Sequence, residues 1–321
     1  MTYDSHVDTP TELLKLRDIS IDNKDSQVDF PKLRRGGVDG SFFALYTSAE
    51  LSREAACMRA LQMLSAVYDV IDASGGKAAL TCTPAQAADN KEKGVFSIFV
   101  GMENGSPIGE SLSLLRMFYR LGTRYLTLTH NGDNAIADSA AEGKTWGGLS
   151  PFGREVVAQM NRLGMMVDLS HASDATFWDC IKYSKAPVVA THSCCRALCS
   201  HRRNLTDDML RALADKDGYV GINFYPYFLS DSYTGEESTL PGVKEIVDHI
   251  DHAVEICGIS HVGIGSDYDG IEVTPAGMED VSRMPLVFDE MRRRGYTPEQ
   301  IELVSGANLM AVLNRVIKCS E

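Results

Sequence analysis

The hydrophobic and polar positions of this chain form two kinds of segment that alternate along nearly its whole length. Short apolar runs with the spacing of β-strands are followed by polar loops, and then by longer stretches with apolar residues at helical spacing. Eight runs predict strands, of which the first is weak on periodicity alone: Thr2–Asp8, Gly40–Tyr46, Val95–Gly101, Tyr125–His130, Met165–His171, Pro187–His192, Gly218–Phe224 and Val262–Asp267.

The segments between these strands predict helices, several of which have recognisable ends. Ser150 is placed to cap a helix that has Pro151 in its first turn. Gly122, Gly164 and Gly258 each follow a helix, where a left-handed residue is expected. The predicted helices are Glu50–Ala73, Glu110–Leu121, Ser150–Leu163, Ser173–Ser184, Thr206–Asp215 and Val243–Cys257.

The alternation of strands and helices predicts the fold class, an α/β protein with a parallel sheet covered by helices. Eight units favour closure into a (β/α)8 TIM-like barrel, and an open doubly wound sheet is the alternative. The 321 residues suit one barrel of about 250 residues with added loops, and no linker rich in Pro, Gly or Ser interrupts them. We therefore expect a single domain over residues 1–321, with its chemistry at the C-terminal ends of the strands.

Charge and composition exclude several classes of partner. The formal net charge is −13, which argues against a nucleic-acid partner because such a protein needs a basic face. No run approaches the ~20 apolar residues of a membrane helix, and no signal peptide precedes the first predicted strand. The sequence thus predicts a protein without a membrane span, located in the cytoplasm.

The eight cysteines are scattered through a chain long enough to form a large apolar core. This distribution favours free thiols in a reducing compartment over disulfides. Cys194, Cys195 and Cys199 are close in sequence but contain no CxxC pair, which disfavours a metal site of their own.

Residues able to bind a metal gather at the ends of six of the eight predicted strands. A single such residue is most simply a capping or solvated side chain, but four of the eight histidines occupy such ends, which favours a shared site. His6 and Asp8 are two residues apart, so an extended chain presents both side chains on one face. The residues at strand ends are His6, Asp8, Glu103, His130, His171, His192 and Asp267.

The types of ligand indicate the metal. Imidazole and carboxylate without thiolate suit zinc best, and manganese or cobalt is possible. Two ions ~3.5–4 Å apart can share a bridging carboxylate and a bridging hydroxide, and Glu103 is the natural bridge. The hydroxide would be the nucleophile, because a bound metal lowers the pKa of water toward ~7.

Ten short motifs carry a resemblance to a known family. The chain resembles the membrane (renal) dipeptidase family, peptidase family M19, of the amidohydrolase-like metal-dependent hydrolases. The resemblance runs from about residue 3 to about residue 317, and its motifs are specific in combination rather than singly. They are DSHVDTP at Asp4–Pro10, GGV at Gly36–Val38, GMENG at Gly101–Gly105, RYLTLTHN at Arg124–Asn131, NRLGM at Asn161–Met165, VDLSH at Val167–His171, THS at Thr191–Ser193, RNL at Arg203–Leu205, GINFY at Gly221–Tyr225 and GSDYDG at Gly265–Gly270.

The resemblance implies a dinuclear zinc dipeptidase and assigns the site residues. His6 and Asp8 would bind one zinc, His171 and His192 the other, and Glu103 would bridge the two. The substrate would be a dipeptide with a free C-terminal carboxylate, whose C-terminal residue can have the D configuration in this family. Some relatives also open β-lactams, and relatives are commonly homodimers.

Further residues receive roles in substrate binding and catalysis from the same resemblance. His130 would hydrogen-bond the substrate and stabilise the oxyanion, and Asp267 would carry the proton from the attacking water to the leaving amine. Arg203 would pair with the terminal carboxylate, since a guanidinium binds a carboxylate through two hydrogen bonds. Tyr225 could assist Arg203 in binding the carboxylate, but the sequence is equally consistent with an aromatic residue of the hydrophobic core.

Other residues near these motifs receive lesser roles or none. Asp168 is interpreted as a structural or supporting residue. The remaining histidines are expected to play no part in catalysis: His201, His249, His252 and His261.

Alternatives remain open at this stage. A zinc amidase or deacylase of N-acyl amino acids would need the same carboxylate and amide contacts and would differ at the N-terminal amine. A catalytically inactive metal-binding barrel is disfavoured because the residues expected to be catalytic are retained. A phosphotriesterase-like hydrolase is disfavoured because Glu103 occupies the bridging position. The loop after His130 and the segment after Pro10 depart from the family pattern, so side-chain preference is the least defined feature.

Overall fold

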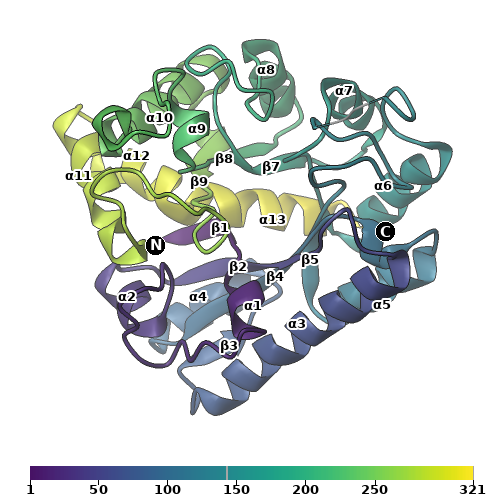
Figure 1. Cartoon of the computed structure of the whole chain (residues 1–321), viewed down its shortest axis with the longest axis horizontal. Helices are drawn as coiled ribbons and strands as arrows, with labels where there is room; N and C mark the ends of the chain where they lie inside the picture. The colour runs from purple at the N-terminus through teal and green to yellow at the C-terminus, as the bar shows by residue number, and fades with distance from the viewer. Residues whose placement is uncertain (142–143, 321) are drawn as a thin grey trace.

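The structure, a computed structural model, describes residues 1–141 and 144–320, and within them nine parallel strands form one sheet (Figure 1). The strand order is β1-β2-β4-β5-β6-β7-β8-β9, and β3, which is not part of this path, pairs with β4. The strands are β1 (Tyr3–Val7), β2 (Gly40–Tyr46), β3 (Ala78–Leu80), β4 (Phe96–Glu103), β5 (Thr123–Thr127), β6 (Met166–Asp168), β7 (Val188–Ser193), β8 (Tyr219–Ile222) and β9 (Val262–Ile264).

The first and last strands approach each other at their C-terminal ends. The backbone N–H of Asp8 donates to the carbonyl oxygen of Tyr268 at 2.9 Å, and that of Asp267 donates to His6 at 3.1 Å. Eight of the strands therefore form a nearly closed parallel barrel, and the predicted (β/α)8 architecture is confirmed over the open doubly wound sheet.

Helices connect the strands and surround the barrel (Figure 1). No helix within residues 1–141 and 144–320 combines the length and the apolar character needed to cross a bilayer. The α-helices are α1 (Thr9–Leu13), α2 (Phe30–Arg35), α3 (Arg53–Ala73), α4 (Pro84–Glu92), α5 (Leu112–Arg120), α6 (Pro151–Leu163), α7 (Asp174–Tyr183), α8 (Asp207–Asp215), α9 (Pro226–Leu229), α10 (Val243–Cys257), α11 (Met284–Arg293), α12 (Pro298–Glu302) and α13 (Asn308–Lys318).

The interior of the barrel is filled by one large side chain from almost every strand. Phe42 stacks on Phe99 with ring centroids 4.7 Å apart and lies 5.2 Å from the ring of Tyr125. Leu309 and Leu313 of α13 belong to the same buried cluster, and α13 runs across the strands in Figure 1. The last helix thus packs against this interior layer, while the opposite ends of the strands carry the residues of the site.

The predicted elements are present, with differences at their boundaries. The helices after Ser150, Ser173 and Thr206 begin one residue later than predicted, because each of these residues is the N-cap and its side chain accepts from the backbone. Gly164 is left-handed as expected (φ 74°, ψ 36°), whereas Gly258 has a positive φ but an extended ψ (83°, 149°). All eight cysteines are free thiols, as predicted.

Candidate metal centre

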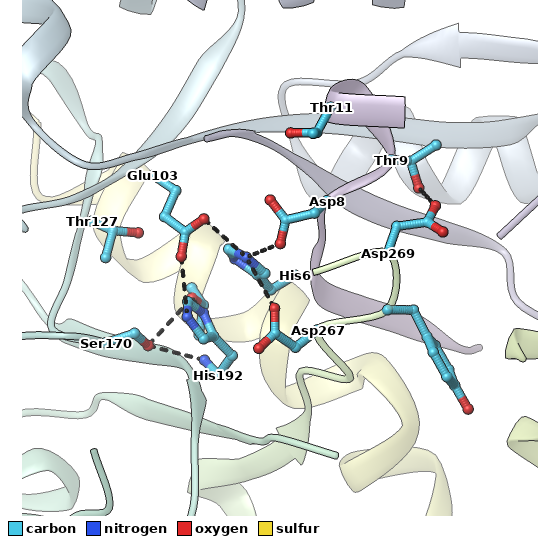
Figure 2. A network of polar contacts seen from close by, with 12 residues as sticks. His6, Asp8, Thr9, Thr11, Glu103, Thr127, Ser170, His192, Asp267 and Asp269 are labelled. Atoms are coloured by element: carbon cyan, nitrogen blue, oxygen red, sulfur yellow. Dashed lines mark hydrogen bonds and ion pairs between the residues drawn. The ribbon is translucent and has the colours of Figure 1, made fainter. Parts of the chain in front are cut away.

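The five predicted metal ligands lie together at the C-terminal ends of the strands. Figure 2 shows four of them, His6, Asp8, Glu103 and His192, gathered around one point. His6 and Asp8 come from the end of β1, Glu103 is the last residue of β4, His171 follows β6 and His192 lies in β7. Each residue is at most 8% exposed. The barrel brings these segments together across sequence separations of up to 186 residues.

Glu103 presents its two carboxylate oxygens to different partners. Oε1 lies 3.0 Å from Nε2 of His171 and 3.4 Å from Nε2 of His192. Oε2 lies 3.7 Å from Nε2 of His6, and that nitrogen is 3.3 Å from Oδ2 of Asp8. The two oxygens of this carboxylate therefore face different histidines, although the ligand atoms of His6 and His192 also lie close to one another.

Each of the three histidines is held through its Nδ1 atom, so that Nε2 faces Glu103. Nδ1 of His6 is 2.8 Å from the hydroxyl of Tyr125, and Nδ1 of His171 is 3.2 Å from Oδ1 of Asn131. Nδ1 of His192 is 2.9 Å from the hydroxyl of Thr191. Contacts of this kind fix the ring orientation of a metal-binding histidine.

The polar atoms facing the centre of this cluster fit a cation. Nε2 of His6, Nε2 of His192 and Oδ1 of Asp8 are buried, and none has a hydrogen-bond partner among the described residues. Burial and the neighbouring carboxylate of Asp8 raise the pKa of Glu103 well above its usual value, and burial lowers the pKa values of His171 and His192. A bound cation would coordinate these unpartnered nitrogen and oxygen atoms. Its positive charge would also offset the negative charge of the neighbouring carboxylates.

Asp267 lies beside this cluster, with Oδ1 3.7 Å from Nε2 of His6 and Oδ2 accepting a hydrogen bond of 2.9 Å from the amide of Asn223. Burial and the carboxylate of Asp8 raise the pKa of Asp267 to about 7. Such a carboxyl group can both take up and release a proton near neutral pH.

The backbone turns sharply where His171 and Asp267 follow their strands. Both residues have left-handed φ angles, 66° for His171 and 65° for Asp267, which are uncommon for residues other than glycine. These conformations cost free energy and are frequent at functional sites. Gly270 lies against the same turn, where a Cβ atom would be 2.2 Å from Oδ2 of Asp8 and 2.6 Å from Oδ1 of Asp267.

His130 lies at the edge of the cluster, 4.0 Å from Oε1 of Glu103 through Nε2. Its ring lies 4.2 Å from that of His171 and packs edge-on against Tyr46 at 4.7 Å. Burial and the positive charge of Arg203 lower the pKa of His130 to about 4, so the ring is neutral near pH 7 and carries one N–H.

Arg203 is a buried guanidinium, only 6% exposed, which lines the same cavity. One terminal nitrogen donates to the carbonyl oxygen of His192 at 3.3 Å, and Nε has no partner among the described residues. Its charge lies over the ring of Phe228, 5.4 Å from the centroid, and burial lowers its pKa to about 10. Tyr225 is half-buried and lines the cavity, with its ring packed edge-on against Phe228.

A cavity of about 820 Å³ opens over the cluster, and its wall contains residues that the sequence analysis did not identify. Arg17 donates to Oδ1 of Asp269 and to Oε2 of Glu12, each at 2.7 Å. His201 also lines the cavity but packs on Phe228 rather than among the ligand atoms. Glu12 and Arg17 carried no signal in the sequence because the segment after Pro10 departs from the family pattern, whereas the position of His201 outside the ligand cluster agrees with the expectation that it plays no part in catalysis.

A nearly closed parallel barrel with imidazole and carboxylate side chains at the C-terminal ends of its strands has the architecture of a metal-dependent hydrolase. Comparison with known proteins identifies the family. The model of the membrane dipeptidase family (peptidase family M19) matches residues 1–321, and the chain belongs to this family. It is therefore a metallodipeptidase, as the resemblance implied.

Individual relatives agree with this assignment. The chain is 35% identical to an uncharacterised dipeptidase of Schizosaccharomyces pombe over 328 residues, covering 96% of this chain and 79% of that one. It is 37% identical to the dipeptidase aclJ of Aspergillus oryzae over 305 residues, covering 90% and 70%. Its structure is similar to that of a metallopeptidase from Rhodobacter sphaeroides liganded with a phosphinate mimic of L-Ala-D-Ala, with a TM-score of 0.92, 30% identity and coverage of 98% and 99%.

Proposed function

We propose that this dipeptidase uses two zinc ions bridged by Glu103 and hydrolyses dipeptides that have a free C-terminal carboxylate, including those with a C-terminal D residue. The division of the Glu103 oxygens between His6 on one side and His171 and His192 on the other is the observation that carries the proposal. His6 and Asp8 would hold one ion, and His171 and His192 the other. The phosphinate mimic of L-Ala-D-Ala bound by the similar metallopeptidase supports the choice of substrate.

The zinc pair, when bound, would polarise the amide carbonyl and lower the pKa of water at the site. Asp267, whose pKa is raised to about 7, would take the proton from the attacking water and deliver it to the leaving amine. The neutral ring of His130 would donate an N–H to the oxyanion. Arg203 would pair with the substrate carboxylate through its guanidinium, whose Nε has no hydrogen-bond partner among the described residues, and Tyr225 would line the same cavity.

Metal analysis and a substrate panel test this proposal together. Protein purified without chelator is expected to contain two zinc equivalents per chain, and Glu103→Ala to lose both metal and activity. With added zinc, L-L and L-D dipeptides should be hydrolysed, whereas D-D dipeptides and N-acetylated amino acids provide the comparison. One zinc or none per chain would contradict the dinuclear centre, and faster turnover of N-acetylated amino acids would favour the amidase.

The homodimer and the cytoplasmic location stay predictions of the sequence and the family resemblance. Sedimentation velocity at micromolar concentration would test the dimer. The chain has a mass of 35.1 kDa, and we expect a single species of about twice that mass.

A further inference from the structure

Asp168 is a buried carboxylate that has no part in the proposed catalytic cycle, and it is connected to the metal ligand His192 through a hydroxyl group. Asp168, the last residue of β6, is fully buried. Its Oδ1 accepts from the backbone N–H groups of Ser170 and Thr191, at 3.1 and 2.8 Å. Its Oδ2 accepts from the hydroxyls of Thr127 and Thr191, the latter at 2.7 Å. All four donors point at one side chain that does not reach the metal cluster itself.

The hydroxyl of Thr191 connects this carboxylate to His192. A hydroxyl has a single proton, and the Thr191 hydroxyl lies 2.7 Å from Oδ2 of Asp168 and 2.9 Å from Nδ1 of His192. The bond to the anion is the shorter one, and hydrogen bonds to ionised groups are about twice as strong as neutral ones. The proton of Thr191 therefore goes to Asp168, and the Thr191 oxygen accepts the N–H of His192 at Nδ1. Nε2 is then left with its lone pair facing Glu103.

Among residues 1–141 and 144–320, no such link to a carboxylate is found for the other two histidines. Nδ1 of His6 faces the hydroxyl of Tyr125 and Nδ1 of His171 faces the amide oxygen of Asn131, and these are neutral partners. Ser170 adds a second restraint on His192 alone, because its hydroxyl accepts the backbone N–H of His192 at 3.0 Å (Figure 2). Within the part of the chain that the structure describes, His192 alone of these three histidines is joined to a buried carboxylate through one intervening hydroxyl.

We propose that Asp168, acting through Thr191, is a positioning residue that sets the protonated nitrogen of His192 and determines how tightly the His171 and His192 side of the centre retains its metal. The inference rests on the proposed dinuclear zinc site. A hydrogen bond donated by the outer nitrogen of a ligating histidine fixes the ring and raises its basicity, and loss of such partners typically lowers metal affinity 10–100-fold. Here the acceptor is a hydroxyl that in turn donates to a carboxylate.

Three variants of the zinc-loaded protein separate this role from general stability. Thr191→Val removes the link with little change in shape, Thr191→Ser retains the hydroxyl, and Thr127→Val removes a different hydroxyl from the same Asp168 oxygen. Zinc retention is measured by chelator competition. Thr191→Val should release one of two zinc ions at a 10- to 100-fold lower chelator concentration than wild type, while the other two variants stay within threefold.

A second measurement keeps the test independent of folding defects. In histidine-labelled, zinc-loaded protein, the Nδ1–H proton of His192 should exchange slowly with solvent in wild type and in Thr127→Val, and rapidly in Thr191→Val. Equal zinc retention in wild type and Thr191→Val, or an equal loss in Thr127→Val, would overturn the proposal. Fewer than two zinc ions in the wild type would instead contradict the dinuclear centre, and the positioning role with it.

Discussion

The side-chain amide of Asn223 donates a 2.9 Å hydrogen bond to Oδ2 of Asp267 and thereby directs Oδ1 of the same carboxylate toward Nε2 of His6, 3.7 Å away. The amide and the left-handed backbone at Asp267 together hold the carboxyl group at the edge of the cluster. An Asp267→Asn variant keeps this shape and removes the proton-accepting group. We expect metal content to be unchanged and kcat to fall by ~10²–10⁴-fold, the usual contribution of general acid–base catalysis.

The control for this experiment is Asp208→Asn on α8, the same chemical change at a side chain that is 81% exposed and outside the cavity. Its kcat should equal that of wild type. Full activity of Asp267→Asn at unchanged zinc content would rule out the proton transfer assigned to this residue.

Arg203 is expected to recognise the substrate carboxylate. Arg203→Met keeps much of the buried volume but loses the charge, which should cost about 2–4 kcal/mol for a buried charged pair. This corresponds to a fall of roughly 30- to 1,000-fold in kcat/KM for dipeptides with a free carboxylate. C-terminally amidated dipeptides should change by less than about threefold, since they do not present the carboxylate.

The adjacent Arg202 provides a matched control for Arg203. Arg202 also borders the cavity, but it is exposed, and its guanidinium bonds the carbonyl oxygen of Ala141 at 3.3 Å. Arg202→Met should affect both kinds of dipeptide equally and weakly. A parallel loss for free and amidated dipeptides in Arg203→Met would show that the residue does not read the carboxylate.

The sequence predicted the barrel and the cluster of ligands for the same physical reason. Parallel strands bring their C-terminal ends to one edge, so residues such as His6, Glu103 and His192 could be placed near one another from strand ends alone. The contacts that orient these residues could not be predicted, because they join distant segments. Tyr125 lies 119 positions from His6, and only the folded barrel brings the two side chains together.

The sequence analysis did not predict β3 or seven of the helices, namely α1, α2, α4, α9, α11, α12 and α13. Two of these omissions show what the local sequence does and does not signal. The strand β3 has only three residues, Ala78–Leu80, and two of them are alanines, which are depleted in strands. The helix α4 did have a sequence signal, the capping box formed by Thr83 and Gln86 with Pro84 in the first turn. The left-handed conformation of His171 and Asp267 had no sequence signal, since it depends on the turns that follow their strands.

Gly270 should not tolerate a side chain, because two acidic side chains occupy the space that a Cβ atom would need. In Gly270→Ala the new Cβ would be 2.2 Å from Oδ2 of Asp8, well inside contact distance, and this carboxylate would have to move. We expect weaker zinc retention on the His6 side and a loss of at least tenfold in kcat/KM. Val273→Ala in the same loop, at a side chain that is 36% exposed, should leave both properties unchanged.

The zinc measurement distinguishes this steric effect from a loss of stability. If Gly270→Ala melts earlier but retains both ions and full turnover, the proposed clash with Asp8 is wrong. If zinc retention and turnover fall while the melting temperature of the zinc-free protein is maintained, the clash acts at the site.

His249 should make the folded protein less stable in acid, although it lies outside the metal cluster. This ring is fully buried on α10, where Nδ1 accepts the backbone N–H of Cys195 at 3.0 Å and Nε2 donates to the carbonyl oxygen of Leu229 at 3.1 Å. A proton on Nδ1 would face the N–H of Cys195 and break that bond. Burial accordingly lowers the pKa of His249 to about 4.

The unfolded chain takes up a proton on this histidine near pH 6.5, whereas the folded chain does so only near pH 4. Between these values the unfolded state binds more protons, so the free energy of unfolding falls as the pH falls, by roughly 3 kcal/mol in total. Other groups also titrate in this range, and a comparison of wild type with His249→Asn isolates the contribution, because the asparagine oxygen can still accept from Cys195. Urea unfolding at pH 7 and pH 5 should show a smaller loss of stability in the variant, and equal losses in the two proteins would contradict a neutral, buried His249.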